Sequence, residues 1–355
     1  MDFRGQLALK FNIQIASQYS VPELIRLAQL AHAEGFEQVW INDNLCQRNL
    51  FVVLSAIAAC VPIKLGASII VPYFRNPVDI ADTVAALSEL TQGREFSVGI
   101  ARGDLVHVAR QIDTHKPIAM VRETTLAVKA LLAGDTINFR EYPASAAYHH
   151  IRREQEFKLA FPPAAPVRFY CGGNAPRILK IAGEIMDGIL IGNSYIPLVR
   201  TRRLDSLLAI ARGAAQTRQP GKTLFDVCEL DASISRDRRR ALEFAKPCVA
   251  RVLLSLALAG FTRDDFHAMG IEPRILAALK EANAGGAMLH AASTIIPDSV
   301  VSSCMVAGGP EECRDQVVAL MEEAERLKIG QIAFAKLGPD YDEAIELLRH
   351  QVLPA

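Results

Sequence analysis

Hydrophobic and polar positions divide the chain into short apolar runs that alternate with longer amphipathic segments. Residues 65–71 form an apolar run rich in branched side chains, which is typical of a strand buried on both faces. Seven further segments have strand character: 7–16, 38–41, 95–100, 167–171, 188–191, 224–234 and 331–336. Each of the eight is followed by at least one segment with helical periodicity.

The expected helices carry start and stop signals. Pro77 begins one that ends near Gly93, with Asn76 placed to cap it and Asp79 in its first turn. Gly35 closes another, over residues 21–34. The remaining helices are expected at 50–60, 117–133, 175–186, 198–217, 236–258, 310–328 and 341–352. Residues 136–165 are irregular, and 262–300 contain helices and turns without a clear strand.

Eight strands alternating with helices in one chain of 355 residues favour a (β/α)8 TIM-like barrel. An open doubly wound sheet is the alternative. No linker, short repeat or low-complexity tract interrupts the pattern, so a single domain over residues 1–355 is expected, with insertions near 136–165 and 262–300. In either fold, chemistry is expected at the carboxyl ends of the strands.

Composition narrows the functional classes. The 39 basic and 39 acidic side chains balance, which argues against nucleic acid as the main partner. The apolar run 252–261 is too short to span a bilayer, and the N-terminus lacks a signal-peptide pattern. The seven cysteines contain no CxxC pair, so reduced thiols are expected. These features predict a soluble cytoplasmic protein.

Polar residues follow several of the predicted strands, and Gly172-Gly173-Asn174 is the most informative group. Two glycines between a strand and a helix allow backbone N–H groups to approach an anion at the positive end of the helix. The same glycines are also found in tight strand–helix turns that bind no anion, and this is the more frequent case.

Acidic residues and histidines near strand ends have two interpretations as well. Asp104 is either a functional acid or the cap of a short helix over 105–110, and Asp43 either acts in chemistry or satisfies backbone groups. His149 and His150 are expected in a solvated loop. No Ser-His-Asp order, Walker loop or zinc signature is present, which disfavours hydrolase, kinase and metalloenzyme functions; no metal site is expected.

Taken together, five segments resemble the bacterial-luciferase-like family of flavin- and deazaflavin-dependent oxidoreductases. They are WINDN (40–44), KLGASIIVPYFRNP (64–77), LTQGREFSVGIARGD (90–104), YCGGNAPRILKIAGEIMDGILIGN (170–193) and VAGGPEEC (306–313). Within that family the chain is most similar to the methylenetetrahydromethanopterin reductases, which use coenzyme F420. The resemblance covers nearly the whole chain and implies a TIM-like barrel, commonly a homodimer, with F420, or alternatively FMN, in the C-terminal mouth.

The resemblance also implies roles for individual residues. It implies a cis peptide bond at Ser68–Ile69, where a bulge that includes Ile70 supports the cofactor ring. It implies an acid near the ring at Asp43 and the reductases' acid after strand four at Asp104. The implied phosphate-side contacts are Gly172, Gly173, Asn174 and Ala175, followed by Gly192 and Asn193 in the next loop.

Two departures from the reductases bear on function. Gln14 stands where they carry a glutamate in strand one, and an amide cannot deliver a proton. Ile70 and Val71 replace a polar pair. The leading hypothesis is a hydride transfer between F420 and a small organic acceptor, with Asp104 and Asp43 supplying or orienting the proton. An FMN-dependent monooxygenase or reductase, and a non-catalytic pterin- or deazaflavin-binding relative, are the alternatives. The substrate side of the pocket is expected to be shaped by 136–165 and 262–300.

Overall fold

Eight parallel strands close into a barrel in the computed structural model, which describes residues 9–104 and 108–354. In barrel order they are β1 (Lys10–Ile15), β2 (Gln38–Ile41), β3 (Lys64–Ile70), β4 (Phe96–Ile100), β7 (Val167–Gly172), β8 (Gly188–Ile191), β9 (Phe225–Ile234) and β11 (Gln331–Ala335). β11 pairs with β1 and β9 pairs with both β8 and β11, so the sheet has no open edge within the barrel. The predicted barrel and its eight strands are confirmed, and the open sheet is excluded.

The strands separate two apolar layers. Trp40, Tyr170, Val227, Leu190 and Ala333 form a cluster inside the barrel, and the larger core lies where the strands meet the surrounding helices. Every residue of β2 and of β4 is buried, which explains their continuous apolar composition. The interior of the barrel is therefore a packed core below the mouth, as side chains on alternate positions fill it.

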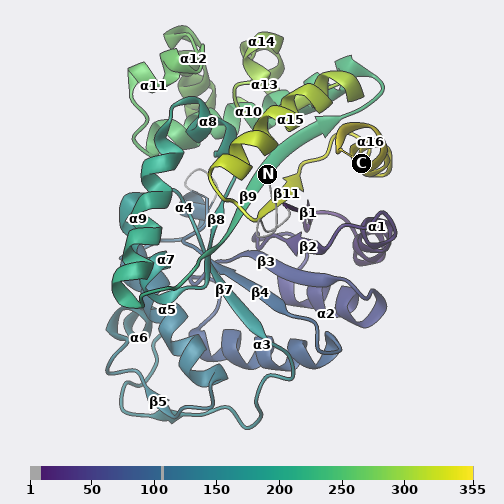
Figure 1. Cartoon of the computed structure of the whole chain (residues 1–355). Coiled ribbons are helices and arrows are strands. Elements are labelled where there is room, and N and C mark those ends of the chain that lie inside the picture. Colours follow the sequence, from purple (N-terminus) through teal and green to yellow (C-terminus); the bar gives the residue numbers. More distant parts are fainter. Residues whose placement is uncertain (1–8, 105–107, 355) are drawn as a thin grey trace.

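Helices surround the barrel (Figure 1). Their bounds are α1 (Val21–Ala33), α2 (Leu50–Cys60), α3 (Pro77–Leu90), α4 (Val108–Gln111), α5 (Pro117–Leu132), α6 (Pro143–Tyr148), α7 (Pro176–Ile185), α8 (Tyr195–Arg200), α9 (Arg203–Arg218), α10 (Arg238–Leu258), α11 (Arg263–Ala268), α12 (Pro273–Ala284), α13 (Met288–Ile295), α14 (Asp298–Val301), α15 (Pro310–Arg326) and α16 (Tyr341–Leu347). The expected cap of α3 is present, because Asn76 Oδ1 accepts from the backbone N–H groups of Val78 and Asp79 at 3.0 Å each. Gly35 follows α1 with the expected positive φ of 79°.

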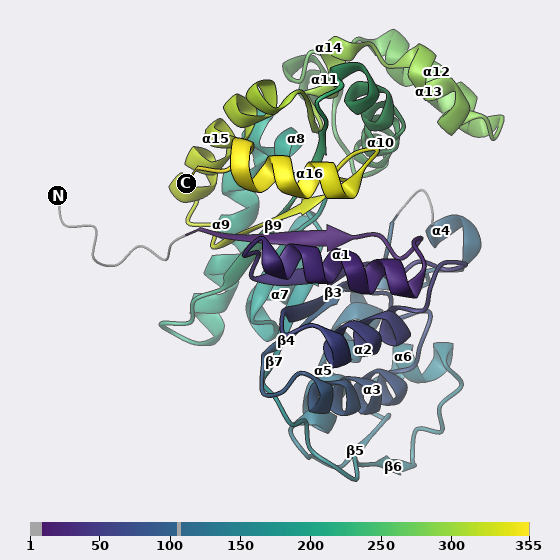
Figure 2. The ribbon, with the colours of Figure 1, turned by 90° about the vertical axis from the view of Figure 1, so that its right-hand side faces the viewer.

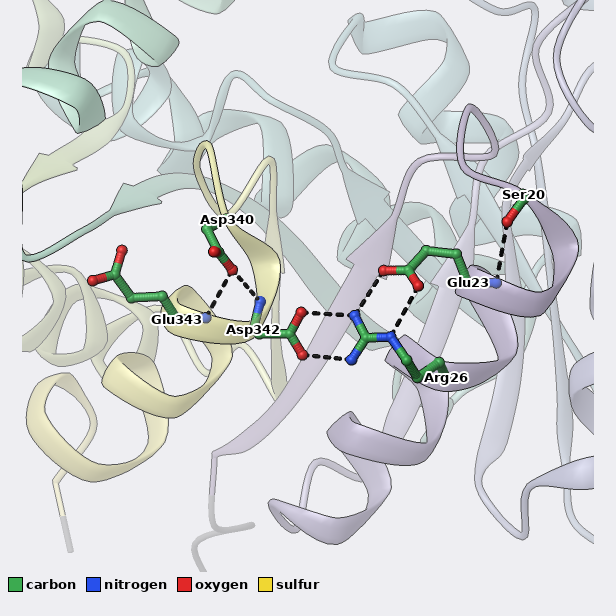
Figure 3. Close-up of polar contacts among 6 residues, drawn as sticks. All are labelled: Ser20, Glu23, Arg26, Asp340, Asp342 and Glu343. Carbon is green, nitrogen blue, oxygen red and sulfur yellow. Dashed lines mark hydrogen bonds and ion pairs between the residues drawn. The ribbon is translucent and has the colours of Figure 1, made fainter.

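The first and last helices are joined where the barrel closes (Figure 3). Arg26 on α1 donates to both carboxylate oxygens of Asp342 on α16, at 2.6 and 2.7 Å, and also to Glu23. Asp340 caps α16 by accepting from the backbone of Asp342 and Glu343. Because the Arg26 and Asp342 side chains are about half exposed, this pair contributes only about 0.2–1 kcal/mol to stability.

Four local predictions were wrong or incomplete. The single helix expected over 198–217 is two helices, α8 and α9, because Arg202 adopts a left-handed conformation with φ 57° between them. A strand that was not predicted, β10 (Val306–Gly308), pairs with the outer end of β9, which continues three residues past its pairing with β11. The irregular segment 136–165 contains a small antiparallel pair, β5 (Ile137–Asn138) with β6 (Glu156–Phe157), as well as α6. The last helix continues as a π-helical turn, Leu348–Val352.

The two insertions lie at opposite ends of the molecule (Figures 1 and 2). Helices α11 to α14 gather beside α10 at the top of both views, and β5 with its hairpin lies at the bottom. Among residues 9–104 and 108–354, no helix combines the length and apolar character needed to cross a bilayer. The start of the strand expected over 7–16 and most of the short helix expected over 105–110 fall outside the described residues.

Candidate active site

A cavity of about 840 Å³ opens at the carboxyl ends of the barrel strands. Ile69 and Leu190 belong both to its wall and to the cluster inside the barrel, so that cluster forms its floor. The lining includes eleven of the twelve residues expected at the site: Gln14, Asp43, Ser68, Ile69, Asp104, Gly172, Gly173, Asn174, Ala175, Gly192 and Asn193. Its volume lies within the range of small-molecule and cofactor sites. The strand ends therefore converge on one site, as the sequence predicted.

Ile70 is the exception. It is fully buried, pairs in register with Ile100 of β4, and belongs to the core between strands and helices. Neighbouring residues of a regular strand point to opposite faces of the sheet. The register of β3 against β4 shifts between Ala67 and Ile70, so this alternation is interrupted there. Ile70 therefore does not line the cavity, in contrast to the expectation that it supports a cofactor ring, whereas Val71 does.

The peptide bond between Ser68 and Ile69 is cis, as the resemblance implied. Two glycines on neighbouring strands make room for the side chain that follows it. A Cβ at Gly99 or at Gly172 would lie 2.9 Å from Ile69 Cγ2. Glycine at both positions thus allows Ile69 to pack across β4 and β7 and to present an apolar surface to the cavity.

Asp43 is tied to the segment after β3. Its carboxylate receives two hydrogen bonds from the Arg75 guanidinium, one of them at 3.0 Å, and a third at 3.2 Å from the backbone N–H of Val71. The Arg75 guanidinium lies over the Phe51 ring, 4.9 Å from its centroid. Both side chains of this ion pair are largely buried, with 3% of Asp43 and 13% of Arg75 exposed. This arrangement holds the segment after Ile69 in place, and Asp43 accepts from the backbone as one of its two interpretations expected.

The loops after β7 and β8 form a candidate anion cradle. Gly173 has a φ of 138°, and α7 begins three residues later with no side-chain cap at Ala175. Asn174 Nδ2 donates to Ser194 Oγ at 2.8 Å, which joins the two loops. A Cβ at Gly192 would meet nothing within 4 Å. Backbone N–H groups at the positive end of α7 can therefore approach a phosphate or carboxylate.

Gln14 and Glu229 form the polar part of the inner wall. In the amide orientation that satisfies both of its neighbours, Gln14 Nε2 donates to Glu229 Oε1 at 2.9 Å and Gln14 Oε1 accepts from Ser68 Oγ at 3.0 Å. Burial, and then the nearby Asp231 carboxylate, raise the pKa of Glu229 to about 7. A half-buried carboxyl group thus faces the cavity and exchanges its proton near neutral pH.

Asp231 and Lys336 form an ion pair beside Glu229. Lys336 Nζ lies 2.6 Å from Asp231 Oδ2, and the Asp231 side chain is 1% exposed. Although burial opposes the charged form of Lys336, the carboxylates of Asp231 and Glu229 raise its pKa above the ordinary value. Lys336 therefore stays protonated, and its single positive charge balances only one of the two negative charges that Asp231 and Glu229 can carry.

Asp104 lies nearer the roof that α10 forms over the cavity. Ser255 Oγ lies 3.4 Å from Asp104 Oδ2, and Arg251 and Ser255 of α10 both line the cavity. The backbone N–H of Val108 donates to the Asp104 carbonyl at 3.0 Å. Burial lowers the pKa of the neighbouring Arg102. One acid, Asp104, and two arginines, Arg102 and Arg251, thus line this part of the cavity.

The two insertions differ in their relation to the cavity. Asn283 and Gly286 from the 262–300 segment line it, as expected, whereas no residue of 136–165 does, so that part of the prediction was wrong. His150 is exposed, as predicted, but His149 is not: its Nε2 lies 2.9 Å from the Pro72 carbonyl oxygen, and burial lowers its pKa. The 136–165 segment therefore contacts the loop after β3 through His149 and does not line the cavity.

Glu229, Lys336, Arg251 and Ser255 were missed by the sequence reasoning. A signal was present for the first, because Glu229 and Asp231 are two residues apart in an otherwise apolar strand and so share a face with Val227. Two charges on the inward face of a barrel strand indicate a functional or paired position. The residues of α10 had no such signal, since the sequence does not show which helix covers the mouth.

Comparison with known proteins is consistent with this geometry. Residues 6–326 match the family described as luciferase-like monooxygenase. The chain is 26% identical over 354 residues to the 5,10-methylenetetrahydromethanopterin reductase of Methanolobus tindarius, covering 97% of this chain and 100% of that protein. It is 25% identical over 357 residues to the enzyme of the same name from Archaeoglobus fulgidus, covering 98% and 99%. Among solved structures, the coenzyme F420 dependent tetrahydromethanopterin reductase from Methanopyrus kandleri superposes with a TM-score of 0.74 at 22% identity, covering 97% and 98%.

The barrel, with a cavity at the carboxyl ends of its strands, has the architecture of TIM-barrel enzymes. The chain belongs to the luciferase-like monooxygenase family and is an oxidoreductase of that family.

Proposed function

We propose that this oxidoreductase transfers a hydride between coenzyme F420, a deazaflavin, and a small organic acceptor. The observation that carries the proposal is one cavity with an apolar shelf at Ile69, an anion cradle at residues 172–175 and carboxyl groups on its remaining walls. Full-length similarity to methylenetetrahydromethanopterin reductases supports F420 as the cofactor and a one-carbon pterin as the first acceptor to test.

The residues present fit a phosphate-bearing planar cofactor. Gly192 leaves open the space that a side chain would fill, and backbone N–H groups near the uncapped start of α7 are candidate donors to a phosphate. Ile69, Val71 and Ala101 supply apolar wall against which an aromatic ring can pack. When bound, the deazaflavin would supply or accept the hydride; the protein supplies orientation and exclusion of water.

The acidic residues divide the remaining tasks. Asp43 and Arg75 keep the segment after Ile69 rigid. Asp104, held near Ser255 at the mouth, is proposed to bind the acceptor and to orient the atom that is protonated. Substitution of Asp104 should therefore affect turnover more than cofactor affinity.

Cofactor binding and turnover test the proposal together. F420 and FMN are titrated against the purified protein by thermal shift, any cofactor released on denaturation is identified by absorbance and mass, and oxidation of F420H2 is followed with methylenetetrahydromethanopterin, methylenetetrahydrofolate and simple ketones. We expect binding of F420 and turnover of at least one acceptor. Asp104→Asn should bind F420 with unchanged affinity and turn over about 10²-fold more slowly, since misplacement of a reacting group by about 1 Å costs that much.

Each of the other possible results would support a different function for this protein. Binding of FMN without F420 would indicate a flavin-dependent monooxygenase or reductase. Tight F420 binding without turnover of any acceptor would indicate a non-catalytic relative. Unchanged turnover in Asp104→Asn would remove Asp104 from the mechanism.

A further inference from the structure

Glu229 projects from β9 into the cavity, on the strand face that also carries Val227 and Asp231. Its two carboxylate oxygens lie 2.9 and 3.2 Å from Gln14 Nε2. Gln14 in turn accepts from Ser68 Oγ, next to the Ile69 shelf. The carboxyl group is thus fixed by a neutral donor on β1, beside the surface proposed to support the cofactor ring.

The titratable groups around Glu229 come from three parts of the chain. Asp231 is on the same strand, Lys336 follows β11, and Cys248 of α10 lies near both of these and has a pKa that burial raises. The groups that face it from β1 and β3, Gln14 and Ser68, carry no charge. Lys336 is already paired with Asp231 at 2.6 Å, so two carboxylates share one cation.

We propose that Glu229 donates the proton to the acceptor and that Gln14 and the Asp231–Lys336 pair position its carboxyl group. This proposal rests on the hydride transfer proposed above and specifies where the accompanying proton comes from. Gln14 cannot itself act as an acid, because an amide has no proton to give at neutral pH, but it places one oxygen atom of a carboxyl group beside the shelf.

The step balances with the groups already named. A hydride adds to the carbon of an acceptor C=N or C=O group, and a C–H bond forms. The π-bond pair moves to the nitrogen or oxygen, which takes the proton of the Glu229 carboxyl group, so that an N–H or O–H bond forms as the glutamate O–H bond breaks. The acceptor thus gains one hydride, which carries both electrons, and one proton. A reduced deazaflavin would supply that hydride and release one proton to solvent, and Glu229 would regain its proton from solvent.

Asp43 is less suited to this step. Asp43 already accepts three hydrogen bonds from Arg75 and Val71 and holds a buried cation. Protonation of Asp43 would leave Arg75 with an unpaired buried charge, which is costly. The pKa of Glu229 near 7, raised by burial and then by Asp231, supplies a donor that is protonated in a large fraction of molecules and is readily recharged.

Substitution of Glu229 tests the proposal with F420H2 as donor and the acceptor that wild type turns over. Glu229→Gln keeps the size and the polar contacts but has no acidic proton, so kcat should fall about 10²- to 10⁴-fold while the affinity for F420 stays within about twofold. Wild-type kcat should decrease as pH rises through about 7, and this decrease should be absent in Glu229→Gln. Glu229→Asp should retain more activity than Glu229→Gln. Glu346→Gln, a matched change at an exposed glutamate of α16, should behave as wild type.

A measurement without cofactor tests the titrating group itself. Infrared difference spectra of the ligand-free protein should show a protonated-carboxyl C=O band that disappears as pH rises through about 7 and that is missing from Glu229→Gln. Equal kcat and pH dependence in wild type and Glu229→Gln would overturn the role of Glu229 while the hydride transfer stands. Failure of wild type to oxidise F420H2 would overturn the hydride transfer; the infrared band then decides whether Glu229 exchanges a proton in the cavity, and its absence would refute that as well.

Discussion

Two sides of the cavity each contain a buried carboxylate beside a cation, and they differ in charge balance. On the β2–β3 side, Asp43 faces Arg75, and the Val71 N–H adds a third hydrogen bond. On the β9–β11 side, Glu229 and Asp231 share Lys336. One side has as many cations as carboxylates, and the other has one carboxylate in excess.

This difference determines what each side can do. A carboxylate that is paired with a cation and hydrogen-bonded to the backbone, as Asp43 is, acts as a structural link. The excess carboxylate on the other side is stabilised in its protonated form by burial and by repulsion from Asp231, so Glu229 titrates near pH 7. Carboxylates thus have two roles in this cavity, and their charged neighbours decide which. Asp43, paired with Arg75, supports the Ile69 shelf, whereas Glu229, beside Asp231, is the proposed proton source.

The largest stability effect is expected on the β2–β3 side. Asp43→Asn leaves the Arg75 guanidinium buried without its counter-charge, and breaking a buried ion pair from one side costs about 3–5 kcal/mol. Urea denaturation at neutral pH measures the loss. Asp342→Asn, which removes the exposed partner of Arg26 (Figure 3), is the matched control and should cost about 0.2–1 kcal/mol. A loss for Asp43→Asn no larger than that of the control would show that the pair is not a structural link.

The same urea denaturation experiment on Glu229→Gln tests whether the two sides of the cavity differ in their effect on stability. Because the folded-state pKa of Glu229 is raised from 4.5 to about 7, the stability that its proton provides is fully present below pH 4.5 and is lost as pH rises through about 7. At pH 8 the folded protein therefore carries an unfavourable carboxylate. Glu229→Gln should be at least as stable as wild type at pH 8, in contrast to Asp43→Asn.

Much of the fold could be predicted from the sequence because apolar runs report burial directly. All eight barrel strands and most helices, including the capped start of α3 at Pro77, were expected in the correct order. The break at Arg202 was not, since nothing in its residue type indicates a left-handed conformation. The three-residue strand β10 is too short to produce a pattern and exists because the end of β9 offers it an unpaired edge.

The site was predicted less completely because its energetics depend on pairs distant in sequence. The strand-end positions of Asp43 and Asp104 were visible, but Arg75 is 32 residues from Asp43, and only the fold brings them together. Gln14 was recognised as an amide that cannot donate a proton, whereas Glu229, 215 residues along the chain, could be placed beside it only by barrel closure. The sequence was therefore sufficient to locate the cavity, but the ion pairs and hydrogen bonds within it could be identified only from the three-dimensional structure.

A smaller effect is expected where β4 and β7 support the shelf. In Gly172→Ala the added Cβ would lie 2.9 Å from both Ile69 Cγ2 and Ala101 Cβ, so Ile69 must move toward the cavity. Overpacking of this kind costs about 1–3 kcal/mol. F420 affinity, measured by titration, should weaken together with stability. Gly213→Ala, in α9 where a Cβ would meet nothing within 4 Å, should leave affinity unchanged and stability equal or higher. Equal F420 affinity in both variants would mean that Ile69 does not support the cofactor.

The smallest effect should come from Gln14→Leu on the β9–β11 side. Leucine is similar in size but cannot donate to Glu229, so the ionised form of Glu229 loses a hydrogen bond and its pKa should rise further. The decrease of kcat with pH should therefore move to higher pH, with kcat at low pH changed less than in Glu229→Gln. Gln216→Leu, which removes an amide from the exposed part of α9, is the control and should keep the wild-type midpoint. A midpoint that stays in place or moves to lower pH in Gln14→Leu would show that Gln14 does not stabilise the Glu229 carboxylate, and the excess charge on this side would then be governed by Asp231 and Lys336 alone.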